Sequence, residues 1–252
     1  MNITERISVV NNLQTISSEV VSSVFSLFKT GMSEYEIAKL IRNAFAKRGV
    51  YDFWYDVPLI VLIGTERFLK AANADYAIKS PSQEYTLQDG STIYIDVHPQ
   101  DASTSLWGDW NTMAVFHPRT NIDDEQVAFL EQMRQIHREG IEKLKPTMTG
   151  ADVANYFVEV YQKNGITPLV ATNSDVGHTI HDGLKVGVKR LMLNMENSSL
   201  IGGYIYAIEP AGFRQKKFGD GILVGRFEEC IYIPKEGNAV LLGSKNLLPL
   251  VV

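Results

Sequence analysis

The sequence of 252 residues predicts an α+β fold made of two similar halves. Three observations lead to this prediction. An amphipathic helix pattern occurs twice, at residues 29–50 and 145–166, and apolar strand patterns follow each copy. In both halves an acidic residue stands at the end of such a strand. We therefore expect one domain, residues 1–252, with halves at approximately 20–120 and 140–243.

The two helix segments match in more than their periodicity. Met32 aligns with Met148 and Gly49 with Gly165, and Ser or Thr stands near each helix start. These are the residues that helix capping favours at the two ends. Unrelated amphipathic helices can also look alike, but these two segments agree in the residues at the helix start, in length, and in the glycine after the helix end. A third helix, expected over 123–145, joins the halves, with acids at its start and lysines at its end as the helix dipole favours.

The predicted strands carry the acids. Aligning "IYIDVHP" with "IYAIEP" places Asp96 near Glu209, one acid in each half. Short apolar runs bounded by turn residues favour buried strands. The expected strand segments are 57–64, 91–99 and 107–116 in the first half, and 167–172, 202–212 and 225–233 in the second.

Composition and charge exclude several classes of protein. The net charge of -5 leaves no basic excess for a phosphate backbone, so we expect no nucleic-acid partner. Cys230 is the one cysteine and cannot form an internal disulfide, which fits a reducing compartment. The start "MNITERISVVNNLQT" lacks the pattern of a signal peptide, and the apolar runs are too short to span a membrane. The expectation is a cytoplasmic protein with no membrane partner.

Five residues in or beside the predicted strands indicate a metal site. A lone carboxylate in an apolar strand is costly to bury as an ion, although a single case can cap a turn or face solvent. Several carboxylates gathered around one imidazole would repel one another, and two divalent ions would offset that repulsion. Mixed oxygen and nitrogen ligands favour Mn, Fe, Co or Zn over Ca. The five residues are Asp96, Asp109, His178, Glu209 and Glu228.

The same residues carry a family resemblance. The order "IYIDV", "WGDWNTM", "VGHTIH", "YAIEPAG" and "GRFEECIYIPKEG" resembles the pita-bread metallopeptidase family, which includes methionine aminopeptidase, aminopeptidase P, prolidase and the metal-free creatinase. The resemblance extends from about residue 20 to about residue 243. It implies a pita-bread catalytic domain with two pseudo-symmetric halves, a curved antiparallel sheet and outer helices. Because the domain lacks an added N-terminal domain, the resemblance also implies a homodimer.

The resemblance implies a role for each of these residues. Asp96 would chelate one metal ion, Asp109 and Glu228 would bridge two ions, and His178 and Glu209 would complete the second ion. A water or hydroxide between the ions would attack the substrate, with Glu209 as general base and then acid. Arg226 would orient Glu228, unless it is an ordinary surface residue of its strand.

The sequence also departs from the family pattern. Residues 64–75 contain no histidine, whereas the family peptidases usually have one there that contacts the scissile amide. After His178 the next histidine, His181, comes three residues later, where a substrate-facing role is one interpretation. His98 points to the same strand face as Asp96 and is either an extra metal ligand, a proton donor, or a polar residue bonded to backbone.

The remaining candidates are aromatic residues and two further histidines. Three interpretations are open for a group of neighbouring aromatic residues: they line a substrate pocket, they pack in the core, or they form a dimer contact. These residues are Phe53, Trp54 and Tyr55. His117 and His137 are expected in a loop and on a helix surface.

Three functions are compatible with the sequence. The first is a metal-dependent hydrolase of the aminopeptidase or prolidase type, in which two divalent ions activate a water that attacks a peptide or related C–N bond. The second is a metal-dependent lyase or small-molecule hydrolase on the same scaffold, because a fold does not determine a function. The third is a non-catalytic binding module, which the complete ligand set argues against.

Overall fold

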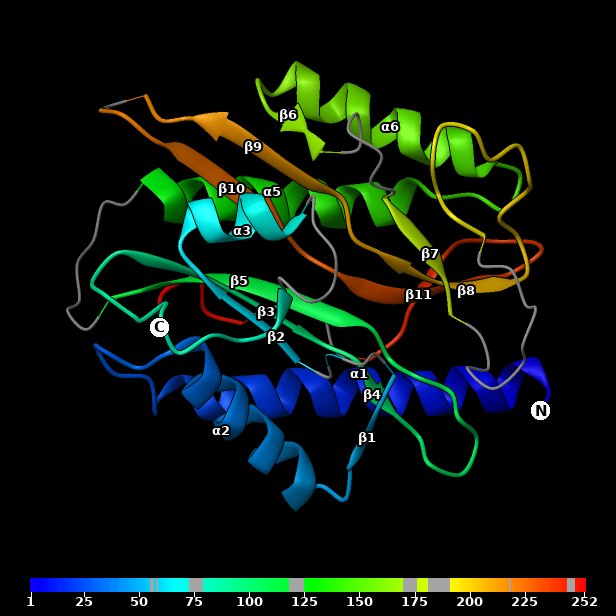
Figure 1. Ribbon diagram of the computed structural model, residues 1–252. Coiled ribbons are helices and arrows are strands. Elements are labelled where there is room, and N and C mark those ends of the chain that lie inside the picture. Colours follow the sequence, from blue (N-terminus) through cyan, green and yellow to red (C-terminus); the bar gives the residue numbers. More distant parts are fainter. Residues whose placement is uncertain are drawn as a thin grey trace.

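The computed structural model describes residues 1–54, 57, 59–72, 79–117, 125–169, 176–180, 191–217, 219–243 and 248–252. Both helices and strands occur along these residues, and the described part of the chain after residue 166 contains strands only (Figure 1). The helices are α1 (Ile3–Phe25), α2 (Glu34–Lys47), α3 (Thr65–Ala72), α5 (Glu125–Lys143) and α6 (Gly150–Lys163). The strands are β1 (Asp52–Phe53), β2 (Leu59–Ile63), β3 (Ser91–Val97), β4 (Pro99–Gln100), β5 (Trp110–Phe116), β6 (Thr167–Pro168), β7 (Gly177–Thr179), β8 (Tyr204–Ile208), β9 (Ala211–Gln215), β10 (Ile222–Arg226), β11 (Glu229–Ile233) and β12 (Val240–Leu241).

The two helices predicted as copies begin in the same way. Ser33 caps α2 and Thr149 caps α6, and each cap forms a reciprocal capping box with an acid three residues later. Such boxes satisfy two backbone N–H groups that a helix start leaves without partners. Both helices have 14 residues, and Gly49 and Gly165 with positive φ follow their ends. Helix α1, for which the sequence suggested nothing, starts with the same device at Asn2.

Two antiparallel sheets position the site. Strands β2, β3 and β5 form one sheet in the order β2-β3-β5, and the other has the order β12-β11-β8-β7. A bridge between Asn111 and Glu228 joins the start of β5 to the residue before β11. The two sheets therefore meet where the predicted ligands lie.

Helices cover the outer faces of these strands (Figure 1). Helices α1 and α2 lie below the sheet of β2, β3 and β5 in this view, whereas α3, α5 and α6 lie above it with β9 and β10. Buried side chains fill both layers, with Phe45 and Trp110 in the lower core and Phe129 and Phe157 in the upper one. None of the described helices is long and apolar enough to cross a membrane.

Two features differ from the sequence prediction. The expected strands over 202–212 and 225–233 are not continuous. The first range contains β8 and the start of β9, and the second contains the end of β10 and β11, with Glu228 between them. In each range the two strands belong to different sheets. His137 of α5 is buried rather than on the helix surface, because β11 supplies Glu229 as its ion-pair partner at 3.3 Å. The helix expected over 123–145 is α5, Glu125–Lys143, within the described residues.

Candidate metal centre

The first two acids meet because β3 and β5 are antiparallel neighbours. Asp96, near the end of β3, pairs in register with Asn111 of β5, and Asp109 directly precedes β5. The exit of one antiparallel strand lies beside the entry of the next, so both carboxylates reach the same end of the sheet. His98 follows β3 at the same end.

The other three residues meet through β8. Ile208 pairs with Gly177 of β7 on one side and with Glu229 of β11 on the other. His178, Glu209 and Glu228 each stand one position from these paired residues. Three segments that are distant in sequence thus bring one side chain each to one place.

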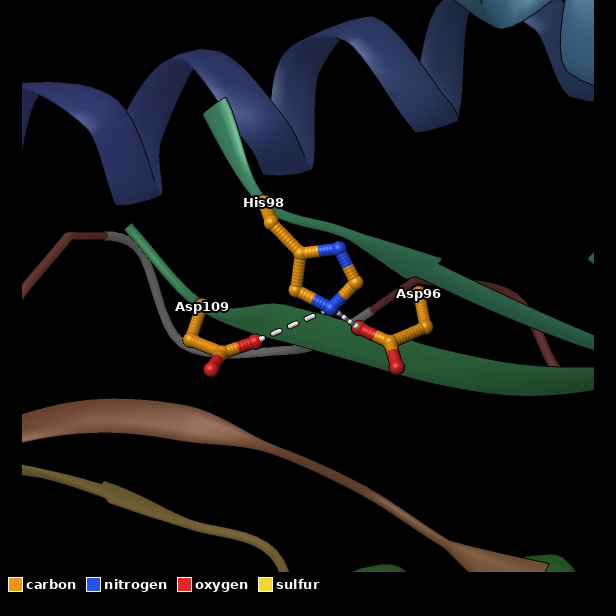
Figure 2. Close-up of side chains that lie close together, drawn as sticks. All are labelled: Asp96, His98 and Asp109. Atoms are coloured by element: carbon orange, nitrogen blue, oxygen red, sulfur yellow. Dashed lines mark ion pairs between the residues drawn. The ribbon is translucent and has the colours of Figure 1, made fainter. Parts of the chain in front are cut away.

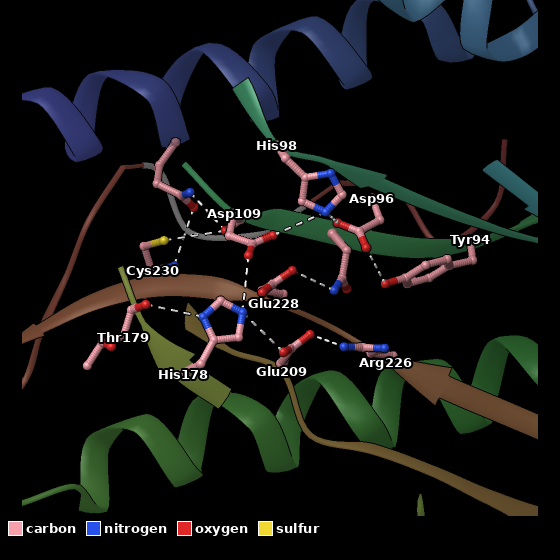
Figure 3. A network of polar contacts seen from close by, with 12 residues as sticks. Tyr94, Asp96, His98, Asp109, His178, Thr179, Glu209, Arg226, Glu228 and Cys230 are labelled. Carbon is pink, nitrogen blue, oxygen red and sulfur yellow. Dashed lines mark hydrogen bonds and ion pairs between the residues drawn. The ribbon is translucent and has the colours of Figure 1, made fainter. Parts of the chain in front are cut away.

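The five residues and His98 form one buried cluster (Figure 3). Asp109 is at its middle: Oδ1 lies 3.5 Å from His98 Nε2, and Oδ2 lies 3.4 Å from His178 Nε2. His98 Nε2 is 2.9 Å from Asp96 Oδ1, and His178 Nε2 is 3.6 Å from Glu209 Oε1. Among the described residues, two groups have donor atoms close enough to share an ion, and Asp109 belongs to both. They are Asp96, His98 and Asp109, and Asp109, His178 and Glu228.

Neighbouring polar side chains hold the carboxylates. The Tyr94 hydroxyl donates to Asp96 Oδ2 at 2.9 Å (Figure 3), and Asn111 Nδ2 donates to Glu228 Oε2 at 2.8 Å. Neither residue is among those predicted from the sequence. Each stands two positions from a predicted ligand, Tyr94 before Asp96 and Asn111 after Asp109, and so on the same strand face. This spacing of two positions is the signal in the sequence from which both residues could have been found.

Two further contacts cross between distant segments. Arg226, expected to orient Glu228, makes its ion pair with Glu209. Gln14 of α1 donates from Nε2 to the carbonyl oxygen of Asp109 at 2.9 Å. No spacing in the sequence signals the Gln14 contact, because the two residues are 95 positions apart in the chain.

The electrostatics of the cluster favour a cation. Burial raises the pKa of Glu228 well above its usual value, and the charges of Asp109 and Asp96 raise it further. Burial also opposes ionisation of Asp96, but the positive charges of His98 and Arg226 lower its pKa overall. Glu228 Oε1 is buried and has no hydrogen-bond partner among the described residues. A buried carboxylate oxygen without a partner is costly unless it binds a cation, so these residues fit divalent metal ions.

An aromatic pair borders the cluster. The Trp107 ring is fully buried, with its centroid 5.5 Å from that of the His178 ring, and the Trp54 ring stacks on it at 3.8 Å between centroids. Trp107 was not among the predicted residues. Phe53 packs edge-on against Phe45 of α2. Tyr55 and His181 lie outside the described residues.

Comparison with models of known protein families gives a match over most of the chain. The model of metallopeptidase family M24 matches residues 10–235. The chain belongs to metallopeptidase family M24. The resemblance seen in the sequence is thereby confirmed, and so is the predicted α+β fold. Comparison with curated protein sequences finds no match.

Solved structures of other M24-like enzymes share the fold. An X-Pro aminopeptidase from Thermotoga maritima has a TM-score of 0.76 at 18% identity, with 100% of this chain and 64% of that chain covered. Prolidase from Pyrococcus furiosus has a TM-score of 0.72 at 16% identity, with 96% and 64% covered. Methionine aminopeptidase from Thermotoga maritima has a TM-score of 0.70 at 17% identity, with 96% and 97% covered. This M24 chain thus spans less than two thirds of the first two and nearly all of the third.

Proposed function

We propose that this M24 chain is a metal-dependent hydrolase of the aminopeptidase or prolidase type, which cuts a peptide or related C–N bond. The single observation that carries the proposal is the buried cluster of four carboxylates and His178, in which Glu228 Oε1 has no hydrogen-bond partner among the described residues. The family match and the names of the structural neighbours support the reaction class.

The proposed ligand set holds two divalent ions of Mn, Fe, Co or Zn. Asp96 would hold one ion, His178 and Glu209 would hold the other, and Asp109 and Glu228 would be shared by both. The position of Asp109, with one oxygen toward each histidine, supports the bridging role. Imidazole together with carboxylate ligands suits these transition metals.

Residues of this chain transfer the proton, position the general base and exclude water. When bound, the ions supply a nucleophilic water of lowered pKa and stabilise negative charge on the substrate. Glu209, beside His178, accepts a proton and returns it to the leaving nitrogen. Arg226 holds Glu209 in place through its ion pair, and the buried Trp107 ring keeps bulk water from His178.

A second candidate function uses the same centre for other chemistry, as a lyase or small-molecule hydrolase. His98, buried between Asp96 and Asp109, favours it because it adds a titratable group beside the ligands. His181 remains a candidate for contact with the substrate, as do Phe53, Trp54 and Tyr55.

We also infer the organisation of the whole chain. It forms one catalytic domain, 1–252, of two pseudo-symmetric halves, and the identical length and capping of α2 and α6 support this duplication. A homodimer, a cytoplasmic location and the absence of nucleic-acid and membrane partners belong to the same proposal.

Metal-dependent turnover of a substrate panel tests the function. Protein stripped with a chelator is reloaded with Mn²⁺, Fe²⁺, Co²⁺ or Zn²⁺ and given peptides with N-terminal Met, Xaa-Pro dipeptides, small amides and sulfonium metabolites. We expect turnover of a peptide only with metal, and none in Asp109→Asn. Asp101→Asn, in the same loop but outside the cluster, serves as the matched control. Turnover of a non-peptide alone would select the second candidate, and full activity of the metal-free protein would exclude both.

A further inference from the structure

His98 is held rigidly beside the proposed centre. It is 2% exposed, and its carbonyl oxygen accepts a hydrogen bond from the Trp54 backbone N–H at 3.0 Å. Figure 2 shows its ring between Asp96 and Asp109, with Nε2 directed at both carboxylates. A histidine held in this way is part of the cluster and not a residue of the strand exit facing solvent.

The donor atoms are spaced as the ligands of one ion are. His98 Nε2 lies 2.9 Å from Asp96 Oδ1 and 3.5 Å from Asp109 Oδ1. Two donors each about 2.1 Å from one metal ion are about 3.0 Å apart at a right angle and about 3.4 Å apart at the tetrahedral angle. We propose that His98 is a nitrogen ligand of the ion held by Asp96 and Asp109. This inference rests on the proposed function, because it requires that the acids bind metal.

The hydrogen bonding of Asp96 supports a shared ion. Tyr94 donates to Oδ2, and this leaves Oδ1 as the oxygen that faces His98 Nε2, at 2.9 Å. Asp96 Oδ1 is therefore available to the same ion as His98.

The added nitrogen changes which metal the position prefers. A set of carboxylate oxygens alone suits Mn²⁺, whereas imidazole favours Fe²⁺, Co²⁺ and Zn²⁺. The two ions then have one histidine each, His98 for one and His178 for the other. We expect Co²⁺ or Zn²⁺ to displace Mn²⁺ readily from the Asp96 position.

Titration of the metal-free protein with CoCl₂ tests the inference through affinity and visible absorption, without an activity assay. We expect His98→Ala to weaken one of two Co²⁺ affinities by more than about 100-fold, since loss of an outer-shell partner alone costs about 10–100-fold. His98→Gln, which keeps a polar side chain, should not restore it. His117→Ala removes a histidine that pairs with Asp89 outside the cluster and should bind like wild type.

X-ray absorption of the wild-type protein loaded with Co²⁺ gives a second measurement that needs no folded variant. We expect about one imidazole per ion, whereas His178 alone would supply one for every two ions. That lower count, or unchanged affinity in His98→Ala, would overturn the inference. Tighter Co²⁺ binding in His98→Ala would also overturn it, because His98 would then act as an internal cation that competes with the metal.

Failure of the inference is distinguishable from failure of the proposed function. If Asp109→Asn loses Co²⁺ while His98→Ala keeps both ions, the metal centre stands and the role of His98 is wrong. If wild-type protein binds no Co²⁺, or Asp109→Asn binds it equally well, the metal centre itself is wrong.

Discussion

At the scale of single residues, Glu228 and Glu229 show how environment separates two adjacent acids. Both are buried, but Glu229 faces His137 across 3.3 Å, whereas Glu228 faces Asp96 and Asp109. Successive residues point to opposite sides of an extended chain. One glutamate therefore has an imidazole as its neighbour, and the other lies among carboxylates whose negative charges disfavour its ionisation.

The contrast predicts opposite effects of two matched substitutions on the metal-free protein. Glu228→Gln removes a charge that burial and the neighbouring carboxylates disfavour, and should therefore raise the free energy of unfolding. It should also weaken Co²⁺ binding. Glu229→Gln breaks the pair with His137 and should cost about 1–3 kcal/mol. Urea unfolding in the presence of a chelator measures both, and destabilisation by Glu228→Gln would contradict the electrostatic account.

The histidines show what sequence alone can say about a residue. His178 was found because glycine and strand residues surround it in the chain. His137 was misplaced, because its burial depends on β11, which no periodicity within α5 reports. Local patterns describe one face of an element but not what packs against the other.

At the scale of elements, the position of His178 on β7 depends on the glycine that precedes it, because any other residue there would be strained. Gly177 has φ near +154°, and a Cβ there would stand 2.1 Å from the Ala207 carbonyl oxygen. That atom is backbone of β8, so a side chain must push two paired strands apart. The short β7 is able to place His178 because Gly177 permits this close approach.

We predict that Gly177→Ala destabilises the protein by about 3 kcal/mol or more and weakens Co²⁺ binding, because the overpacked strand displaces His178. Gly165→Ala is the matched control, since Gly165 also has positive φ but nothing lies within 4 Å of its Cβ position. It should cost only about 1–2 kcal/mol of backbone strain and leave metal binding unchanged. Chemical denaturation and CoCl₂ titration measure both variants. Equal effects would show that the close approach is not the cause.

Helix α1 joins the two sheets through one buried amide. Gln14 donates to the Asp109 carbonyl oxygen and accepts from the Cys230 backbone N–H at 3.3 Å. It thus links the segment before β5 to β11. The position of Asp109 depends on a helix for which the sequence suggested no role.

Gln14→Met should therefore lower the free energy of unfolding by about 1–3 kcal/mol, because buried backbone groups lose their partner. Co²⁺ affinity should fall as Asp109 moves. Gln135→Met changes an exposed glutamine of α5 and should stay within about 0.5 kcal/mol of wild type. A Gln14→Met protein with wild-type stability and metal affinity would exclude the linking role.

At the scale of the whole molecule, stability and metal content are coupled through the cluster. Burial raises the pKa of Glu228 from its usual 4.5, helped by Asp109 and Asp96. Burial lowers the pKa of His98, but the Asp96 and Asp109 carboxylates outweigh it and raise the pKa above 6.5. In the metal-free protein, both groups therefore bind protons more tightly when folded than when unfolded.

The stability of the metal-free protein should therefore decrease as the pH rises. Groups with a raised folded pKa stabilise the fold at low pH, and that contribution is lost as the pH rises through the folded pKa. Asp96, whose pKa is lowered below 3.8, acts in the opposite direction but only in stronger acid. As the pH rises above 4.5 and then above 6.5, the ordinary pKa values of these two groups, the melting temperature of the metal-free protein should fall. Bound Co²⁺ should reduce this fall, because it stabilises the ionised carboxylates and raises stability by mass action. Scanning calorimetry with chelator and with Co²⁺ measures both curves, and a metal-free melting temperature that rises with pH would contradict the prediction.

The sequence by itself determined the α+β class, the repeated capped helices and the order of the acid-bearing strands. It could do so because helix periodicity, capping and strand alternation are local properties of the chain. Asp96 and Asp109 could also be expected together, since a short connection joins their strands.

Only the tertiary structure decided which distant groups meet. The contacts of Gln14 with Asp109, of Arg226 with Glu209 and of Trp107 with His178 depend on how helices and sheets pack. The position of His98 between two carboxylates likewise follows from the register of β3 and β5. Such contacts arise from the packing of separate elements, and no periodicity within a single element encodes them.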